Sequence, residues 1–540
     1  MKLLGLPFTP RFILLTLALV MTAILANEFV MVHHYTLIIG AALVVCAGAS
    51  VLGIRDLMQT RHSILRNYPI AAHARFFFEE IRPEIRQYLF ESETDGAPFG
   101  RDDRAIVYQR AKMVLDKRPF GTQSNVYADN FEWLNHSIAP HPVVKGGFRV
   151  SVGGPHCKRP YDASVYNISA MSFGSLSANA IRALSTGAKL GGFAQDTGEG
   201  GLSPYHQAGG GDIIWEIGSG YFGCRNEDGT FSPETFAAVA GTDQVKMVEL
   251  KLSQGAKPGH GGVLPAAKVS AEIARIRGVP LGKDCISPAR HSVFSTPIEL
   301  VEVIDRMRRL SGGKPTGFKL CIGQPHEFLA ICKAMLATGL SPDFIVVDGK
   351  EGGTGAAPRE FIDHVGMPMR DGLSLVHNAL IGCGLRDRIR IGAAGKIVTA
   401  FDMARVFALG ADWCNAARGF MFAIGCIQSQ SCHTDRCPVG VATQDASRQR
   451  ALVVPTKAQR VANFQKATIA SLAEVVAAAG LDHPNGFGPH HISRRISPST
   501  IKTFAELYPT LKPGELLTGT DDPRFKVAWA NARPESFDVA

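Results

Sequence analysis

A repeating order of short apolar segments, glycine-rich loops and helix-prone stretches begins near Ala163 and constrains the fold more than any other feature. Apolar runs at Asn167–Met171, Gly317–Cys321 and Phe344–Asp348 have the length of buried strands, and each precedes a loop and a helix-prone stretch. Parallel strands joined by helices are typical of an α/β protein, and this rhythm predicts a (β/α)8 barrel. The carboxyl ends of its strands are the expected place for chemistry.

Composition supports a large intracellular α/β enzyme. The chain has 540 residues, an apolar content of 46% and 56 glycines, which leaves room for more than one folded unit. Eleven cysteines show no paired framework, so a reducing compartment is favoured over a disulfide-rich exterior. The net charge is +9, but Lys and Arg are scattered without a long basic block, which argues against a nucleic-acid partner.

Two apolar stretches near the N-terminus, residues 12–26 (extending to Val32) and 36–54, are each close to the length that spans a bilayer. The basic residues near them lie before the first stretch and after the second: Lys2, Arg11, Arg55, Arg61 and Arg66. The positive-inside rule then predicts a transmembrane helical hairpin in the inner (cytoplasmic) membrane, with both ends and the catalytic domain in the cytoplasm. A cleaved signal peptide and a buried soluble hairpin are the alternatives.

The following segment is charged and helix-prone, and Phe76–Leu89 within it predicts an amphipathic helix that lies against a membrane surface or the main domain. We therefore expect four parts: a transmembrane hairpin at 1–60, a helical connecting segment at 61–150, the barrel with its cysteine loop at 151–480, and a C-terminal extension at 481–540.

Three cysteines, Cys426, Cys432 and Cys437, lie in one loop bounded by Gly425 and Pro438. Three thiolates without an obvious fourth ligand suit an iron–sulfur cluster that lacks one corner iron, and a proline after the last cysteine recurs in ferredoxin-type loops. Three unrelated cysteines, or a zinc site completed by His433, are the alternatives, although the spacing does not match usual zinc motifs.

Two glycine loops lie directly before the cysteine loop, at residues 392–396 and 415–419. Glycines allow backbone amides to close on a phosphate, and barrels often place a phosphate site after strands seven and eight. The pair of loops predicts a phosphate-bearing cofactor close to the cluster.

Five motifs, in one order, carry a family resemblance: Met171–Ser177, Thr197–Gly201, Gln254–Gly259, Gly352–Gly355 and Cys437–Gln444. Together they resemble the FMN-binding synthase domain of glutamate synthase, over about 163–444. The resemblance implies FMN on the C-terminal face of a TIM barrel and a [3Fe–4S] cluster on the three cysteines. It also implies reductive amination, in which 2-iminoglutarate from 2-oxoglutarate and ammonia takes a hydride from reduced FMN to give L-glutamate.

The resemblance also implies roles for individual residues. Met171 and Ser172 would lie beside the flavin ring, and Thr197 and Lys319 at its polar edge. The Gly395 and Gly419 loops would hold the flavin phosphate. The first of them departs from the family, because it reads Ala393-Ala394-Gly395-Lys396 in place of an Asp-Gly-Gly type sequence, and Lys396 would itself meet the phosphate. Gly353, Gly355 and Arg418 are the other expected cofactor-binding residues.

Lys257 and Arg277 would hold the substrate carboxylates, a task that suits a point charge and a bidentate fork. Glu199 would orient the flavin edge or cap a turn. The plainer alternatives are an exposed strand end for Lys319 and a helix-surface charge for Arg277.

The chain departs from the family at two positions beside the expected substrate. His260 replaces a glutamate and Val263 replaces a glutamine, which would loosen recognition of 2-oxoglutarate or shift it to another acid or amine. No glutamine amidotransferase domain and no GxGxxG dinucleotide motif precede the barrel, so we expect free or partner-supplied ammonia and a separate electron donor. That donor would be a ferredoxin, a flavoprotein subunit or a quinone-linked protein.

Three other functions remain open from the sequence. A related flavoenzyme that forms or oxidises a different amino acid or amine is favoured by His260 and Val263. A membrane-tethered electron-transfer or partner protein would bind both cofactors without turning over a substrate. An FMN hydroxyacid dehydrogenase needs a catalytic His–Arg arrangement, which His291 and Arg290 do not convincingly supply.

Overall fold

The structure is a computed structural model that describes residues 6–31, 33 and 36–539, and it divides into two compact units between Gly96 and Ala97. Eight residues of the hairpin predicted at 1–60 lie outside the described residues, and Lys2 and Val32, named above, are among them.

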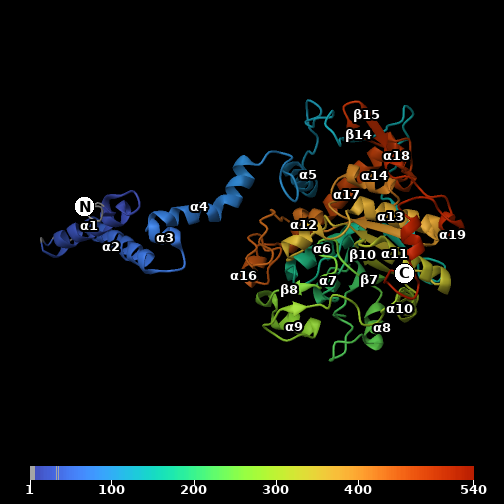
Figure 1. The fold of residues 1–540 in the computed structure, drawn as a ribbon, viewed down its shortest axis with the longest axis horizontal. Coiled ribbons are helices and arrows are strands. Elements are labelled where there is room, and N and C mark those ends of the chain that lie inside the picture. Colours follow the sequence, from blue (N-terminus) through green and yellow to red (C-terminus); the bar gives the residue numbers. More distant parts are fainter. Residues whose placement is uncertain (1–5, 32, 34–35, 540) are drawn as a thin grey trace. The chain divides into compact units, whose positions relative to one another are not determined.

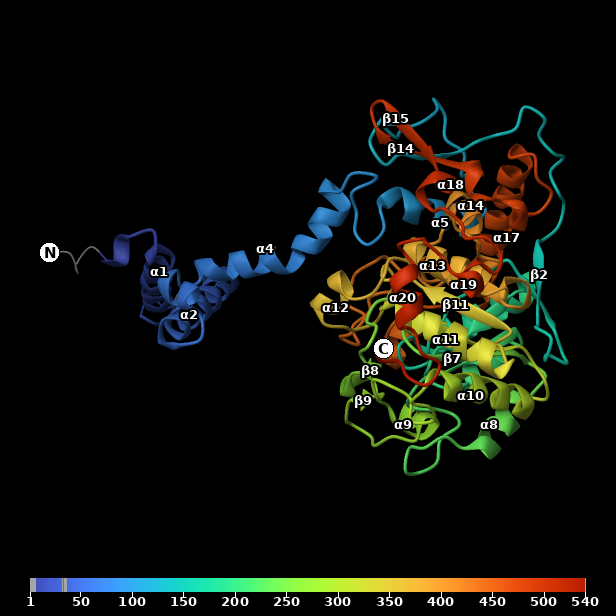
Figure 2. The same ribbon diagram turned by 45° about the vertical axis from the view of Figure 1, so that its right-hand side comes forward.

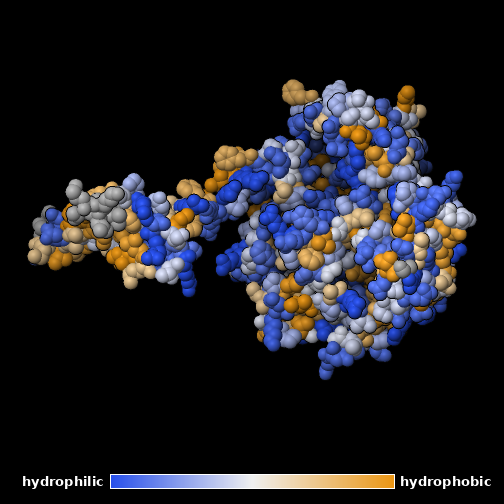
Figure 3. Space-filling view, viewed as in Figure 1, coloured by the Kyte–Doolittle hydropathy of each residue, from blue (hydrophilic) through white to orange (hydrophobic). Residues whose placement is uncertain are grey.

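The first unit contains the two apolar helices, α1 (Ile13–Val30) and α2 (Leu37–Met58), after a short 3-10 turn η1 (Leu6–Phe8). The helices pack on each other, and the hydroxyls of Thr22 and Ser50 are hydrogen-bonded across them at 3.0 Å. With mean hydropathies of 2.1 and 2.5, both are long and apolar enough to cross a membrane, by length and composition. Most of their apolar side chains are exposed, as the orange atoms in Figure 3 show.

The rest of the first unit is helical and continues through α3 (Ser63–Asn67), α4 (Ala71–Ile85) and a π-helical turn η2 (Arg86–Phe90). The helix predicted at Phe76–Leu89 is therefore present. The buried carboxylate of Asp56 in α2 accepts the backbone N–H of Ile70 at 3.0 Å and pairs with the His73 ring at 3.0 Å, which ties the start of α4 to the end of α2. Phe77 and Phe78 of α4 stay exposed.

The second unit is built on a closed barrel of eight parallel strands, which confirms the predicted fold (Figure 1). Around the barrel, in chain order, the strands are β4 (Tyr166–Ile168), β5 (Ala194–Asp196), β6 (Asp212–Ile217), β7 (Val245–Lys251), β10 (Thr316–Leu320), β11 (Phe344–Asp348), β12 (Arg390–Ala394) and β13 (Trp413–Ala416), and β13 pairs with β4 to close the ring.

Helices cover the outside of the barrel, as Figures 1 and 2 show. The helices and turns that follow the strands are α6 (Ala178–Gly191), α7 (Pro204–Ala208), α8 (Pro233–Ala240), α10 (Pro297–Leu310), α11 (Pro325–Thr338), α12 (Arg359–His364), α13 (Met369–Gly382), η4 (Arg386–Arg388), α14 (Ala400–Ala408), α15 (Arg418–Ala423), α16 (Ala446–Gln449) and α17 (Val454–Ala478). An insertion between β7 and α10 adds β8 (Val263–Leu264), η3 (Ala266–Lys268), α9 (Ala271–Arg277) and β9 (Cys285–Ile286).

Alternation along the strands explains why continuous apolar runs form this barrel. In β11, Phe344 and Val346 join a small inner core with Trp413, whereas Ile345 and Val347 belong to the large core beneath the helices. A hairpin of β2 (Arg149–Val152) and β3 (Tyr161–Ser164) contributes Val150, Val152, Tyr161 and Ala163 to the same inner core. The barrel interior is therefore filled with side chains and is not a pore.

The flanking segments of this unit also pack on the barrel. Helix α5 (Arg101–Lys112) contacts α15 and α17, so the compact unit begins inside the segment 61–150 that we predicted as a connector. Strand β1 (Glu132–Leu134) pairs with β14 (Ile492–Ser497), which pairs with β15 (Thr500–Thr503). The C-terminal region also contains η5 (Pro484–Gly486), η6 (Pro489–His491), α18 (Phe504–Leu507), α19 (Glu515–Thr518) and α20 (Lys526–Asn531).

Trp413 provides a test of the inner core. Its indole is 1% exposed and meets the Phe344 ring edge-on at 5.8 Å. Because a buried aromatic truncation leaves a cavity, Trp413→Ala should lower the free energy of unfolding by about 3–5 kcal/mol in denaturant titrations. Leu517→Ala, at an exposed position, should change it by less than about 0.5 kcal/mol. Equal effects of the two substitutions would show that the inner core does not stabilise the barrel.

Candidate active site

The predicted cofactor and substrate residues lie in or directly after barrel strands, or in the insertion that follows β7. Met171 and Ser172 follow β4, Thr197 and Glu199 follow β5, Lys257 follows β7, Arg277 ends α9, Lys319 lies in β10, Gly353 and Gly355 follow β11, Gly395 and Lys396 follow β12, and Arg418 and Gly419 begin α15 after β13. Since all eight strands are parallel, these positions share one end of the barrel. The cysteine loop comes directly after α15.

Arg277 joins the insertion to the loop after β4. Its Nη2 donates to the Phe173 carbonyl at 3.0 Å and to the Ser172 hydroxyl at 3.4 Å. The side chain is only 4% exposed, and its Nε has no hydrogen-bond partner among the protein atoms of the described chain. The alternative of a helix-surface charge is therefore wrong: this guanidinium is buried beside the predicted flavin-edge serine with a free donor.

Three cations surround one carboxylate on this side of the barrel end. Lys251, the last residue of β7, pairs with Glu199 at 3.0 Å. Lys257 donates to the Ala356 carbonyl at 2.9 Å, in the loop after β11. Burial raises the pKa of Glu199, but Lys251, Arg277 and Lys257 outweigh it and hold that pKa below its usual value. Formally, three positive charges face one negative charge, so the group has an excess of positive charge that suits an anionic ligand.

Lys319 lies deeper, inside the barrel. Its ammonium pairs with Glu216, lies 3.3 Å from a Glu249 oxygen and lies 4.0 Å from an Asp196 oxygen. The side chain is only 3% exposed, so the alternative of an exposed strand end is wrong. Burial acts to lower the pKa of Lys319, but the surrounding carboxylates have the larger effect and raise this pKa well above its usual value. The lysine is thereby held as a cation on the inner wall.

The carboxylates around Lys319 outnumber it. Burial and Glu216 raise the pKa of Asp196 well above its usual value. Burial likewise raises the pKa of Glu249 to about 7, with Lys319 opposing this and Glu216 adding to it. The cluster therefore holds at least one proton near neutral pH.

Thr197 takes part in the barrel itself. Its hydroxyl donates to the Gly198 carbonyl at 3.0 Å and accepts the backbone N–H of Glu216 at 3.1 Å, so it links β5 to β6. Gly198 (φ +65°) brings the backbone close to the loop after β4, and a Cβ at this position would lie 2.8 Å from the Ser172 nitrogen. Only glycine fits this approach.

The loops after β11, β12 and β13 form the other half of the barrel end. A cavity of about 400 Å³ borders Gly395 and Lys396 and is also lined by Phe99, Glu351 and Arg370, among others. Arg418 is half-buried beside these loops, with its guanidinium 4.7 Å from the centre of the Phe99 ring.

A Cβ at Gly353 would lie 2.9 Å from the Arg418 side chain, which would have to shift to make room for it. Burial, together with Arg418, lowers the pKa of Lys396. The arrangement of glycine backbone, the exposed Lys396, the half-buried Arg418 and an adjoining cavity fits a cofactor phosphate.

The cysteine loop has a tightly turned backbone. Gln428, Gln430 and Asp435 are all left-handed, with φ of 59°, 55° and 63°. The Gln428 N–H points at the Cys426 sulfur at 3.5 Å. Burial is the main cause that raises the pKa of the Cys426 thiol to about 12, and the neighbouring Cys432 and Cys437 act in the same direction. Such a set, with a backbone donor aimed at sulfur, fits a thiolate-bound cluster.

Helix α5 and the residues before it hold this loop. Tyr108 donates to the Cys426 carbonyl at 2.6 Å, and the Gln428 amide bridges the Phe99 N–H and carbonyl at 3.2 and 3.1 Å. His433 is exposed. Among the described residues the sole compact group of three metal-ligating side chains is Asp196, Glu216 and Glu249, so the geometry does not bring His433 and the cysteines together as a zinc site.

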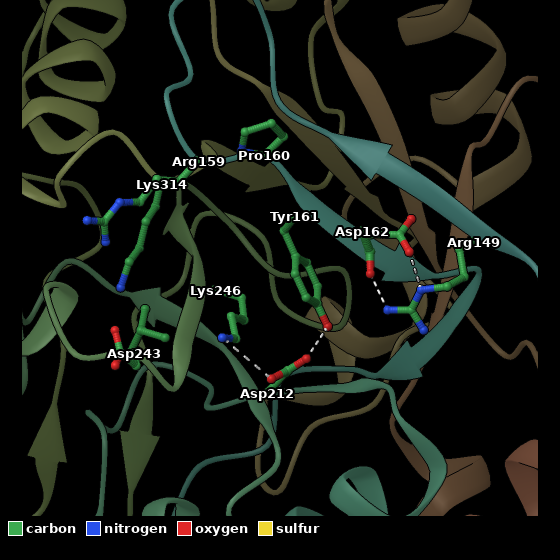
Figure 4. Close-up of a pocket in the computed structure, with 10 residues that line it drawn as sticks. Arg149, Arg159, Pro160, Tyr161, Asp162, Asp212, Asp243, Lys246 and Lys314 are labelled. Atoms are coloured by element: carbon green, nitrogen blue, oxygen red, sulfur yellow. Dashed lines mark hydrogen bonds and ion pairs between the residues drawn. The ribbon is translucent and has the colours of Figure 1, made fainter.

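A second cavity, of about 440 Å³, lies at the amino ends of the strands and is shown in Figure 4. Its charged groups pair with one another: Arg149 with Asp162 at 2.6 Å, and Tyr161 with Asp212 at 2.8 Å. Lys314 donates to the Ala240 and Thr242 carbonyls. No predicted site residue lines this cavity, which belongs to the end of the barrel closed by β2 and β3.

Sequence reasoning missed several of these groups. Lys251, Glu249 and Glu216 are charged residues at the carboxyl ends of apolar strands, and that pattern alone could have identified them. Lys268, whose ammonium contacts the cysteine loop, gave no such signal, because its partners are backbone carbonyls.

The protonated cluster predicts a pH dependence. The folded-state pKa of Glu249 is raised to about 7, whereas an unfolded glutamate titrates near 4.3. Between these values the folded state binds more protons, so stability falls as the pH rises through this window. Glu249→Gln removes this loss, and its stability relative to the parent protein, from urea titrations, should be greater at pH 8 than at pH 5.

Glu360→Gln, which removes an exposed carboxylate of α12, is the control. If the difference between Glu249→Gln and the parent did not change with pH, Glu249 would not hold the proton.

Comparison with known proteins assigns the family. The model of the conserved region in glutamate synthase matches residues 161–482, more than half of the chain. The glutamate synthase large subunit-like protein YerD of Bacillus subtilis is 41% identical over 489 residues, which cover 83% of this chain and 93% of that protein.

Other relatives match a smaller part. The archaeal glutamate synthase [NADPH] of Methanocaldococcus jannaschii is 34% identical over 356 residues, 65% of each chain. The glutamate synthase [NADPH] large chain of Bacillus subtilis is 34% identical over 288 residues, which span 52% of this chain but only 18% of that protein. The matched family region contains the whole barrel end and the cysteine loop described above. The chain therefore belongs to the glutamate synthase family and is a glutamate synthase-like oxidoreductase.

Proposed function

We propose that this protein is an FMN and [3Fe–4S] oxidoreductase that reductively aminates 2-oxoglutarate, or a related 2-oxo acid, with ammonia to give L-glutamate or its homologue. The observation that carries this proposal is the cationic group of Lys251, Lys257 and Arg277 around Glu199, because a dicarboxylate substrate needs fixed positive charge. Relatives named glutamate synthase support the same reaction.

FMN would lie across the barrel end. The glycine loops with Lys396 and Arg418 would hold its phosphate, and Met171 and Ser172 would border its ring, beside Arg277. When bound, FMN supplies hydride transfer. Lys319 would place a fixed cation at the polar edge of the ring, and the surrounding carboxylates keep that ammonium in position without exposing it to water.

The protein side chains would bind and orient the substrate. Arg277 has its free Nε to offer to one carboxylate, and Lys257 provides a point charge for the other. The Lys251 ammonium holds Glu199 as an anion, and an anionic carboxylate beside the substrate would bind and orient ammonium. Burial of the whole group would exclude water from the reacting atoms.

Val263 favours a second candidate function, in which the substrate is a 2-oxo acid related to 2-oxoglutarate. It occupies β8, which pairs with β9 within the insertion that also contains Arg277. Nearby, the His260 ring meets Phe361 edge-on at 5.2 Å and its Nδ1 faces the Gly261 carbonyl at 2.8 Å. An apolar side chain in place of a glutamine would remove one hydrogen bond to 2-oxoglutarate and accept a more apolar 2-oxo acid, in either reaction direction.

The three cysteines would hold the [3Fe–4S] cluster, which passes electrons from a separate donor to the barrel end. A ferredoxin, a flavoprotein subunit or a quinone-linked protein would serve as that donor. We also propose that α1 and α2 anchor the protein in the inner membrane with the barrel in the cytoplasm, since both helices have the required length and hydropathy. The division of the chain into a hairpin (1–60), a connecting segment (61–150), the barrel (151–480) and a C-terminal extension (481–540) remains a prediction.

Arg277 gives the sharpest test of the reaction. Arg277→Met should raise the KM for the 2-oxo acid about 10- to 100-fold, because hydrogen bonds to a charged group contribute about 1.5–3 kcal/mol. The measurement is reoxidation of the dithionite-reduced flavin by 2-oxoglutarate and ammonium under anaerobic stopped flow, and Arg277→Lys should recover part of the loss.

Arg275→Met is the matched control. Arg275 lies two residues before Arg277 on the same helix but is exposed, so this substitution should leave KM unchanged. Flavin content shows whether each variant is folded. If 2-oxo acids with ammonium did not reoxidise the flavin of the parent protein, the proposed reaction would be refuted.

Membrane anchoring is tested on the full chain in fractionated cells. A protein that α1 and α2 insert should stay with the membranes through high salt and alkaline carbonate and leave only with detergent. Release by salt alone would indicate surface attachment, and recovery in the soluble fraction would contradict anchoring.

A further inference from the structure

Lys268 is a buried cation at the meeting point of three segments. Its Nζ donates to the carbonyls of Ser175 at 2.6 Å, Ala442 at 3.3 Å and Cys432 at 3.4 Å. Ser175 belongs to the loop after β4, and Cys432 and Ala442 belong to the cysteine loop and its continuation. The side chain of Lys268 is only 2% exposed, so water does not solvate the ammonium.

No carboxylate among the described residues lies within 4.0 Å of this ammonium. Burial lowers the pKa of the Lys268 ammonium to about 8, Asp435 opposes this, and Arg277 is a like charge that adds to it. Asp435 is already engaged, since its Oδ1 accepts the Gln444 N–H at 2.7 Å. A buried cation without a paired anion is costly, so its surroundings should supply negative charge.

A cluster bound by three thiolates would supply that charge. We propose that Lys268 is the counter-ion of the iron–sulfur cluster and raises its reduction potential, an inference that rests on the cluster of the proposed function. The three carbonyl partners accept hydrogen bonds from the Lys268 ammonium and fix it in place beside the loop. Lys268 is thus a positioning and tuning residue that does not touch the substrate.

The direction of the effect follows from charge. When the electron donor adds one electron, the cluster is reduced by one unit, the donor is oxidised by one unit, and the cysteine loop becomes more negative without any proton transfer. A fixed ammonium nearby stabilises this added charge, more strongly in a buried site than in water. Removing the cation should therefore make the cluster harder to reduce.

The test is an EPR-monitored redox titration of the detergent-purified full chain, with dithionite and mediators. Lys268→Gln, which is neutral but can still donate hydrogen bonds, should shift the midpoint potential of the three-iron signal to a more negative value. Lys268→Arg should keep it near that of the parent protein. If the glutamine variant does not retain iron, Lys268→Met provides a second neutral substitution for the same titration.

Lys457→Met is the matched control. The Lys457 ammonium also lies beside the cysteine loop, 2.8 Å from where a Cβ on Gly425 would be, but its side chain is partly exposed to solvent that screens its charge. The shift in midpoint potential caused by Lys457→Met should be clearly smaller than that caused by Lys268→Gln. Equal midpoints for the parent and the neutral Lys268 variants would overturn the inference, whereas absence of any three-iron signal in the parent would refute the cluster itself.

Discussion

Closure of the eight parallel strands into one ring is the constraint on which the rest of the structure depends. Once β13 pairs with β4, every strand must end at the same face, and residues from Met171 to Gly419 are brought to one barrel end although they lie far apart in the chain. The same closure encloses the Lys319 cluster, whose four side chains are buried. Both the site and its electrostatics thus follow from one topological step.

Two clusters of charged side chains, with opposite net charge, lie one above the other along the barrel axis. Inside the barrel, the carboxylates of Asp196, Glu216 and Glu249 outnumber Lys319 and retain a proton. Above it, Lys251, Lys257 and Arg277 outnumber Glu199. A negatively charged interior next to a positively charged site would hold cations and anions at defined depths, which suits the flavin and the acidic substrate of the proposed function.

Part of this could be predicted from the sequence, for reasons that particular residues make clear. The runs at Phe344–Asp348 and Gly317–Cys321 gave strands because buried parallel strands are apolar on both faces, and three cysteines in one loop indicated a cluster. The burial of Lys319 inside the barrel could not be predicted. Alternation shows which residues of a strand share a face, but only the closed ring of strands shows which face points into the barrel. The attachment of α5 to the cysteine loop depends on Phe99 and Gln428, which are 329 residues apart.

The central claim is that the barrel end and the cysteine loop hold one redox pair. It is tested most directly by the visible spectrum and low-temperature EPR of the anaerobically purified full chain, repeated on Cys432→Ser. The account predicts a flavin spectrum together with a three-iron signal, and loss of that signal with retention of the flavin in the variant. Flavin accompanied by zinc, or a protein with neither cofactor, would contradict it.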